Sequence, residues 1–314
     1  MAPADPSATS GAAPVPSACL QRPGDVLSRT AGAPVSWGIS EVAGWGHQMP
    51  ADRVLAEMRG VGLTATELGP DGFLPADPHE RQAVLSGAGL GLVGGFVPVV
   101  LHESGADPVA DSAAALQALA EGGAAMMVLA ADSGAFGYEE RVVLDGDQWC
   151  TLLANLVRVR DAAAGRGVQV ALHPHVGTAV ERSDEVHRVL DGCDVPLCLD
   201  TGHLLIGGTD PAALVAEAAG RVAHAHLKDV DAILADRVRD AELTYSQAVA
   251  QGMYRPLGQG DVDIAGIVSS LEKAGYRGWY VLEQDAVLTG EPAPGAGPVA
   301  DVHASLTFLE GVAG

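Results

Sequence analysis

The chain has 314 residues, of which 48% are hydrophobic and only 4% aromatic, so a core built mainly from Ala, Val and Leu is expected. The net charge of −22 comes from 40 acidic residues against 18 Lys and Arg. Nucleic acids and anionic membranes are bound through Lys and Arg, so neither is an expected partner. No run of 18 uncharged apolar residues stands out, which excludes an ordinary membrane-spanning helix.

Residues 1–31 are rich in Ala, Pro and Ser and lack hydrophobic periodicity, which predicts a flexible tail. They contain no basic segment followed by an apolar one, so no secretory signal is expected. The four cysteines, Cys19, Cys150, Cys193 and Cys198, form no CxxC pair or framework. Reduced thiols and a cytoplasmic location are therefore predicted.

From residue 32 onward, strand-like apolar runs alternate with helical patterns. The strands are expected near residues 33–38, 64–69, 92–100, 125–131, 168–173, 195–200, 222–228 and 278–284. The helices are expected at 51–61, 78–88, 108–120, 146–165, 182–190, 210–219, 241–252 and 264–274. A loop and a last helix are expected within 291–314.

Eight successive strand–helix units predict a single-domain (β/α)₈ TIM barrel over residues 32–290. An open, doubly wound parallel sheet is the alternative. That fold would place a Gly-rich phosphate loop after the first strand, and Ser36-Trp37-Gly38-Ile39-Ser40 does not match GxGxxG. The barrel is therefore preferred.

The predicted strand ends carry residues that bind metals. In TIM barrels the functional groups lie at the C-terminal ends of the strands. Strands five to eight bring four such residues to that end, namely His173, Asp200, His226 and Glu283. Two nitrogen and two oxygen ligands suit one divalent ion, with Mn²⁺ expected first and Co²⁺, Fe²⁺, Zn²⁺ or Mg²⁺ as alternatives.

Several neighbouring residues have more than one interpretation. His175, His203 and His224 are candidates for substrate contact, for support of the metal ligands, or for simple packing. Glu67 ends strand two, where it could bind a substrate hydroxyl or cap the following loop. Lys228 is a candidate proton donor, or a partner of a neighbouring aspartate, either Asp229 or Asp200.

Seven short motifs carry a resemblance to a known family over about residues 33–290. They are Ser36-Trp37-Gly38, Glu67-Leu68-Gly69, His173-Pro174-His175-Val176-Gly177-Thr178, Leu199-Asp200-Thr201-Gly202-His203, His226-Leu227-Lys228-Asp229-Val230, the turn 258–263, and Gly278-Trp279-Tyr280 leading to Glu283. Together they resemble the sugar phosphate isomerase/epimerase superfamily of xylose-isomerase-like barrels. Within it, the chain looks most like inosose dehydratases.

The resemblance implies metal-dependent dehydration of a keto-cyclitol, 2-keto-myo-inositol, through an enolate in inositol-type carbohydrate catabolism. Isomerases of the superfamily usually place a glutamate at the end of strand five, where this chain has His173. Inosose dehydratases share a His-rich end of this strand, which favours elimination over epimerisation. The implied substrate is a small neutral polyhydroxy ketone.

Residue roles follow from this expected chemistry. The base would be Glu283, His203 or His175, and Lys228 or an imidazole would protonate the leaving hydroxyl. Substrate binding is assigned to four residues, namely Trp37, Trp45, Glu67 and His224. The two tryptophans would line the pocket along the apolar face of the ring.

Other functions stay open. An isomerase or epimerase would let solvent deuterium enter the substrate without loss of water. More remote alternatives are a lyase that cleaves 3-keto-glycosides and a sugar-binding subunit without activity. A DNA-repair endonuclease of the same fold is disfavoured by the charge of −22. Barrels of this group often self-associate, so a homo-oligomer is compatible with the resemblance.

Overall fold

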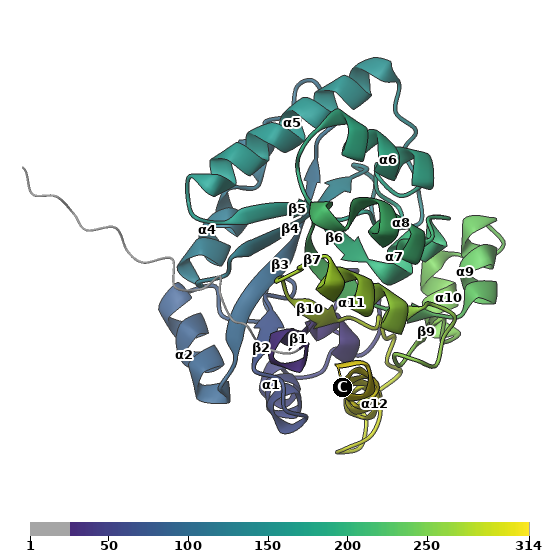
Figure 1. The fold of residues 1–314 in the computed structure, drawn as a ribbon. Coiled ribbons are helices and arrows are strands. Elements are labelled where there is room, and N and C mark those ends of the chain that lie inside the picture. Colours follow the sequence, from purple (N-terminus) through teal and green to yellow (C-terminus); the bar gives the residue numbers. More distant parts are fainter. Residues whose placement is uncertain (1–25, 314) are drawn as a thin grey trace, which may run out of the picture.

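Eight parallel strands close into a barrel in the computed structural model, which describes residues 26–313 (Figure 1). The barrel strands are β1 Thr30–Gly32, β2 Ala65–Glu67, β3 Gly91–Val100, β4 Met126–Asp132, β5 Gln169–Leu172, β6 Leu197–Asp200, β7 Val222–Leu227 and β10 Tyr280–Leu282. Neighbours in the sequence are neighbours in the barrel, and β1 closes it by pairing with both β2 and β10. The predicted (β/α)₈ barrel is confirmed.

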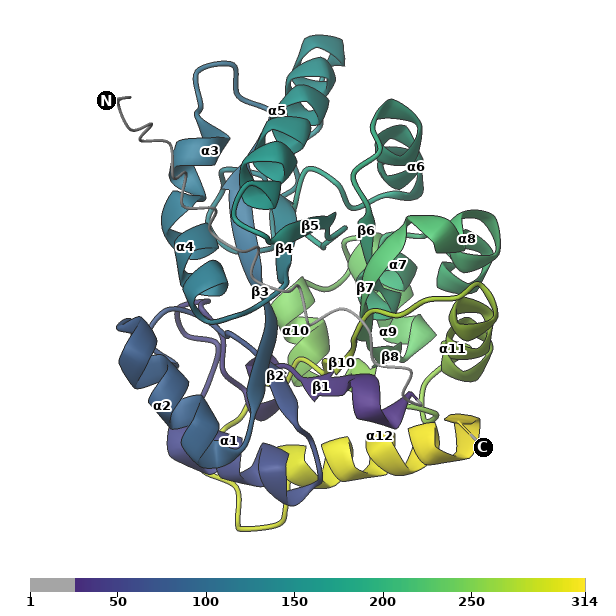
Figure 2. The ribbon, with the colours of Figure 1, turned by 60° about the vertical axis from the view of Figure 1, so that its left-hand side comes forward.

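Helices surround the barrel on its outside (Figure 1). They are α1 Ala51–Gly60, α2 Pro78–Ala88, α3 Pro108–Asp111, α4 Ala113–Glu121, α5 Gly146–Ala164, α6 Ser183–Gly192, α7 Thr201–Ile206, α8 Pro211–Ala218, α9 Ala232–Arg239, α10 Tyr245–Ala250, α11 Ile264–Lys273 and α12 Pro298–Ala313. Several begin at an aspartate that accepts backbone N–H groups, as Asp77, Asp145 and Asp210 do. The last helix, α12, packs against α11 and the turns that flank β1 (Figure 2).

The first barrel strand differs from its prediction. It was expected at residues 33–38, but β1 covers Thr30–Gly32 and Pro34–Trp37 form a 3₁₀ turn. Proline has no N–H to donate to a strand ladder, and Gly38 ends the turn with a φ of 77°. The barrel therefore begins at residue 30, not 32. The rest of the predicted tail, residues 1–25, lies outside the described residues.

The connection between β7 and β10 is longer and more structured than expected. The predicted helix at 241–252 is shorter, and α9 precedes it. Two short strands, β8 Asp229–Val230 and β9 Tyr254–Arg255, pair antiparallel in the same connection. These additions bring Tyr245 and Tyr254 beside the end of the barrel, where their hydroxyl oxygens lie 2.9 Å apart.

The main hydrophobic core lies between the barrel wall and the helices, and within residues 26–313 two small apolar clusters accompany it. One contains Ala31, Ala65 and Val281, from β1, β2 and β10. Among residues 26–313 no helix is long and apolar enough to cross a membrane. Cys150, Cys193 and Cys198 are free thiols, whereas Cys19 lies outside the described residues.

Candidate metal centre at the barrel end

A buried cluster of charged and imidazole side chains lies at the C-terminal ends of β5, β6, β7 and β10. His173 directly follows β5, Asp200 ends β6, His226 lies on β7, and Glu283 directly follows β10. None of the four is more than 9% exposed. Asp200 and His226 are register partners on adjacent strands. The structure therefore brings the four predicted ligands together, and their role as ligands stays a prediction.

Asp200 divides its two carboxylate oxygens between the fold and the cluster. Oδ1 accepts the backbone N–H groups of Gly202 and His203 at 2.9 and 2.7 Å and so caps α7. Oδ2 lies 3.2 Å from His173 Nε2 and 3.5 Å from His226 Nδ1. Burial would raise the pKa of Asp200, but Lys228 and the imidazoles outweigh it and hold the pKa well below 3.8.

His226 and Glu283 face each other through atoms that both have lone pairs. His226 Nδ1 lies 2.5 Å from Glu283 Oε2, and neither atom has a hydrogen-bond partner within the described chain. Such a contact needs a proton or a metal cation between the two atoms. Ligand atoms of Asp200, His226 and Glu283 all lie within 4.8 Å of one another. The residues present therefore fit a divalent ion.

A second trio overlaps the first through Asp200. Ligand atoms of His173, Asp200 and His203 also lie within 4.8 Å of one another. The Nδ1 atoms of both histidines are buried and have no partner among the described residues. The predicted four ligands thus span two overlapping groups, and His203 is a candidate ligand in addition to its predicted catalytic role.

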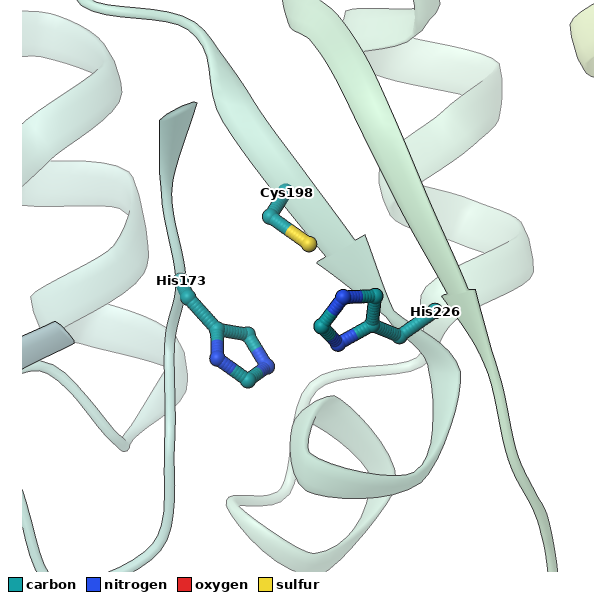
Figure 3. A group of neighbouring side chains, drawn as sticks. All are labelled: His173, Cys198 and His226. Atoms are coloured by element: carbon teal, nitrogen blue, oxygen red, sulfur yellow. The ribbon is translucent and has the colours of Figure 1, made fainter. Parts of the chain in front are cut away.

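Cys198 is a third kind of donor that the sequence reasoning did not identify. It lies on β6, and its ligand atom falls within 4.8 Å of those of His173 and His226. Figure 3 shows its sulfur directed toward the space between the two imidazoles. Burial raises the pKa of this thiol to about 11. Its position two residues before Asp200 on one strand was the available signal.

Lys228 is fully buried among acidic groups. Its Nζ lies 2.7 Å from Asp285 Oδ1, 2.8 Å from Glu283 Oε1 and 3.0 Å from His203 Nε2. Burial would lower the pKa of Lys228, but Asp200, Asp285 and Glu283 raise it well above 10.5. The ammonium ion balances part of the negative charge of the centre.

Of the two alternative aspartate partners of Lys228, Asp200 lies within ion-pair distance, with its Oδ2 3.6 Å from Nζ, whereas Asp229 does not pair with the lysine. The Asp229 carboxylate accepts the backbone N–H groups of Gly258, Gly260 and Val262 at 2.8, 3.0 and 3.0 Å. It therefore holds the loop after β9, a structural task. Asp285 takes the place beside the lysine, which its spacing of two residues from Glu283 could have indicated.

His175 and His203 form a pair of neutral imidazoles next to the cluster. Their ring centroids lie 3.7 Å apart. His175 Nδ1 lies 2.7 Å from the Val176 carbonyl, so Nδ1 carries the hydrogen and Nε2 is unprotonated. Burial lowers the pKa of His175 to about 3 and that of His203 well below 6.5. Both rings are therefore uncharged near neutral pH, and the unprotonated Nε2 of His175 is the nitrogen that could accept a proton.

Glu67 and His224 are predicted to bind substrate, but Glu67 lies on the Nε2 side of His226, away from Asp200 and Glu283. Both are buried, at 4% and 1% exposure. Glu67 Oε1 lies 2.9 Å from His224 Nε2 and 3.1 Å from His226 Nε2. This placement supports a role in holding His226 rather than in touching substrate.

The two predicted tryptophans differ. Trp37 is fully buried, and its Nε1 donates to Glu57 Oε2 of α1 at 2.9 Å, so its ring packs between the barrel and α1. This placement favours a packing role for Trp37, and its contact with substrate stays a prediction. Trp45 lies at the barrel end, where its ring centroid is 6.3 Å from that of Tyr245. Tyr245 donates to Asp285 at 2.5 Å, so Trp45 adjoins the centre.

A cavity of about 150 Å³ lies beside two aromatic rings that are close to His175. Phe96 and Tyr138 line it, and their ring centroids lie 5.5 and 4.5 Å from that of His175. Glu41 and Asp132 also line the cavity, and no cationic side chain does among the described residues. The cavity is therefore suited to an uncharged ligand and unfavourable for a phosphate.

The buried histidines predict loss of stability in acid. Burial lowers the pKa values of four imidazoles below 6.5, those of His173, His175, His203 and His224. As the pH falls, these histidines bind protons in the unfolded chain at a higher pH than in the folded chain, so acid favours unfolding. The stability that depends on the neutral rings is present above pH 6.5 and is lost as the pH falls. Each proton that only the unfolded chain binds lowers the free energy of unfolding by about 1.4 kcal/mol for every pH unit.

His226 affects stability in the opposite direction, because its pKa is raised in the folded protein. Its contribution to the free energy of unfolding is present in acid and is lost as the pH rises through that pKa. The effect of the four histidines with lowered pKa values is therefore expected to exceed the effect of His226. Thermal unfolding of the metal-free protein, followed by circular dichroism, should show a lower Tm at pH 5.5 than at pH 7.5. An equal or higher Tm at pH 5.5 would contradict the neutral state of these rings.

Comparison with known proteins agrees with this architecture. A family model described as "Xylose isomerase-like TIM barrel" matches residues 56–306. The rhizopine catabolism protein MocC of Rhizobium meliloti is 33% identical over 261 residues, covering 80% of each chain. An inosose dehydratase of Geobacillus kaustophilus is 30% identical over 266 residues, covering 81% of this chain and 86% of the relative.

Among solved structures, the IOLI protein with a bound zinc atom superposes with a TM-score of 0.64 at 13% identity, covering 91% of this chain and 98% of that one. At this identity the likeness concerns the fold. The family model and the two relatives each cover most of the chain, and the range matched by the family model includes the buried cluster. The chain belongs to the xylose isomerase-like TIM barrel family.

Proposed function

We propose that this protein is a metal-dependent hydro-lyase that removes water from a keto-cyclitol such as 2-keto-myo-inositol. The observation that carries the proposal is the imidazole-rich end of β5. There His173 lies 3.2 Å from Asp200, and His175 packs against His203. The similarity to a relative named inosose dehydratase supports the same reaction.

His173, Asp200, His226 and Glu283 would hold the metal, with Mn²⁺ expected first. The IOLI protein, which shares the fold, binds a zinc atom, and this supports the proposal that the chain binds a metal. When bound, the ion supplies Lewis-acid stabilisation of the negative charge that develops on the substrate's ketone oxygen. The buried surroundings exclude water, which strengthens such electrostatic effects.

Two residues of the chain, His175 and Lys228, would carry out the proton transfers. His175 Nε2 takes the proton from the carbon next to the ketone, since Nδ1 is held by the Val176 carbonyl. Glu283 is less available as a base, because its two oxygens face Lys228 and His226. Lys228 gives a proton to the β-hydroxyl, which leaves as water. One proton is gained by His175 and one is lost by Lys228, and the enol product becomes a trihydroxycyclohexane dione.

The cavity beside Tyr138 supports an uncharged polyol as substrate. Glu41 and Asp132 would repel a phosphate, and no cation lines the cavity among the described residues. Phe96 and Tyr138 offer apolar faces to the C–H groups of a ring. A small neutral polyhydroxy ketone is therefore the proposed ligand.

The test is incubation of metal-loaded protein with 2-keto-myo-inositol. Ultraviolet absorbance follows the conjugated product, and mass spectrometry follows loss of water and uptake of solvent deuterium. New absorbance with loss of 18 mass units, expected from the chemistry of one water, supports the dehydratase. A His175→Ala variant should lose about 10²-fold or more in turnover, the usual contribution of a positioned acid–base group.

An isomerase or epimerase is the second candidate. The two carboxylates of the trio, Asp200 and Glu283, are the observation that favours it, because such enzymes use carboxylates around the metal. It predicts deuterium in the substrate without new absorbance and without loss of water. That outcome would replace the dehydratase by an isomerase.

A further inference from the structure

The carboxylate of Glu67 reaches across the barrel to the strand that carries His226. Glu67 ends β2, and β2 is separated from β7 by β1 and β10 in the closed order of strands. The register between β2 and β3 shifts between Thr66 and Glu67. An irregularity of this kind changes where a side chain points. The Glu67 side chain is 5% exposed, so its contacts lie within the protein interior.

One carboxylate oxygen of Glu67 contacts two imidazoles. Oε1 lies 2.9 Å from His224 Nε2 and 3.1 Å from His226 Nε2. Both contacts are hydrogen bonds only if the oxygen accepts and each Nε2 carries a hydrogen. The side chains of both histidines are 1% exposed, so water does not offer these nitrogens an alternative partner at the surface.

The contact with Glu67 determines the protonation of Nδ1, the other ring nitrogen of His226. If Nε2 carries the hydrogen, Nδ1 presents its lone pair toward Glu283 Oε2 at 2.5 Å and Asp200 Oδ2 at 3.5 Å. Three electron-pair donors then point toward one region, which is the arrangement a cation requires. Histidine ligands commonly donate their second N–H to a carboxylate, which fixes the tautomer and ring orientation.

We propose that Glu67 is a positioning residue for the metal centre, which holds His226 as the Nε2–H tautomer with Nδ1 directed at the ion. His224 shares the same oxygen and keeps the carboxylate in place. This inference rests on the proposed metal-dependent function. It replaces the role in substrate binding that the sequence suggested for Glu67, and the two roles predict different measurements.

The variant that tests it is Glu67→Gln, with the surface change Glu80→Gln as a matched control, since Glu80 is exposed on α2. An amide of the same size offers one acceptor but no negative charge. Calorimetric titration of metal-free protein with Mn²⁺ should show a Kd about 10- to 100-fold weaker for Glu67→Gln, the usual cost of losing such a support. The control should match the unmodified protein.

The kinetics separate positioning from substrate binding. With the metal at saturation, a positioning role leaves KM for the substrate unchanged, whereas a substrate contact would raise KM and leave the Kd for Mn²⁺ unchanged. Glu67→Asp keeps the charge but is one methylene shorter, so it should bind Mn²⁺ as weakly as Glu67→Gln. Equal Mn²⁺ affinity in Glu67→Gln and the unmodified protein would overturn the proposal.

A measurement on the unmodified protein guards against a variant that fails to fold. ¹⁵N–¹H correlation spectra of the Zn²⁺-loaded protein report which nitrogen of His226 carries the hydrogen. The Nε2–H tautomer is expected, and the Nδ1–H tautomer would overturn the inference. Failure of the unmodified protein to bind any divalent metal would instead contradict the proposed function, so the two failures are distinguishable.

Discussion

Asp200→Asn will leave the protein folded but weaken divalent metal binding by more than about 100-fold, because loss of a residue that only supports a ligand already costs about 10- to 100-fold. Asp200 Oδ2 faces His173 and His226, whereas Oδ1 caps α7. Asparagine is a good N-cap residue, so the amide keeps the cap and removes the charge from the centre. Calorimetry with Mn²⁺ measures the affinity, and circular dichroism measures the Tm.

Asp200→Ala provides the comparison. It removes both the charge and the cap, so its free energy of unfolding should fall by about 1 kcal/mol more than that of Asp200→Asn. Both variants should lose turnover of 2-keto-myo-inositol together with the metal. Full metal occupancy in Asp200→Asn would show that Asp200 is not a ligand, and would leave the ion to other groups of the cluster.

Lys228→Met will destabilise the metal-free protein by about 3–5 kcal/mol, the usual cost of removing one partner from a buried charged group. The ammonium lies 2.7 Å from Asp285 and 2.8 Å from Glu283, in a position without solvent exposure. Methionine fills a similar volume but leaves these carboxylates without their cation. Burying uncompensated carboxylates is strongly unfavourable, and chemical denaturation of metal-free protein measures the loss.

A divalent ion should recover part of this stability, because it brings positive charge to the same carboxylates. Lys273→Met is the control, since Lys273 is exposed at the end of α11, and it should change stability by no more than about 0.5 kcal/mol. If Lys228→Met and the control denature at the same midpoint, the buried lysine does not balance the charge of the centre. Turnover at saturating metal should fall in Lys228→Met in either case, since the proposed proton donor is lost.

Much of the fold was predictable because local patterns in this chain agree with the tertiary structure. Strands and helices alternate along the sequence, and parallel strands joined by helices close into a barrel in chain order. The first strand was misplaced by a few residues. Pro34 belongs to an apolar run, but it cannot donate to a strand ladder, so the run turns into a 3₁₀ helix.

The ligand candidates were predictable for a related reason. His173, Asp200 and Glu283 directly follow or end their strands, and a barrel gathers strand ends at one place. A one-dimensional pattern therefore indicated which residues meet. It did not indicate their partners, since hydrogen bonds between residues far apart in sequence depend on side-chain direction.

The sequence by itself determined the barrel, its family resemblance and the four ligand candidates, because strand periodicity and strand ends are local properties. Only the tertiary structure decided the direction in which Glu67 points, the burial of Trp37 against α1, and the approach of Tyr245 from the β7–β10 connection. Each of these depends on packing between distant segments. The physical reason is that side-chain contacts and burial are set by three-dimensional neighbours, which leave no periodic signal in the chain.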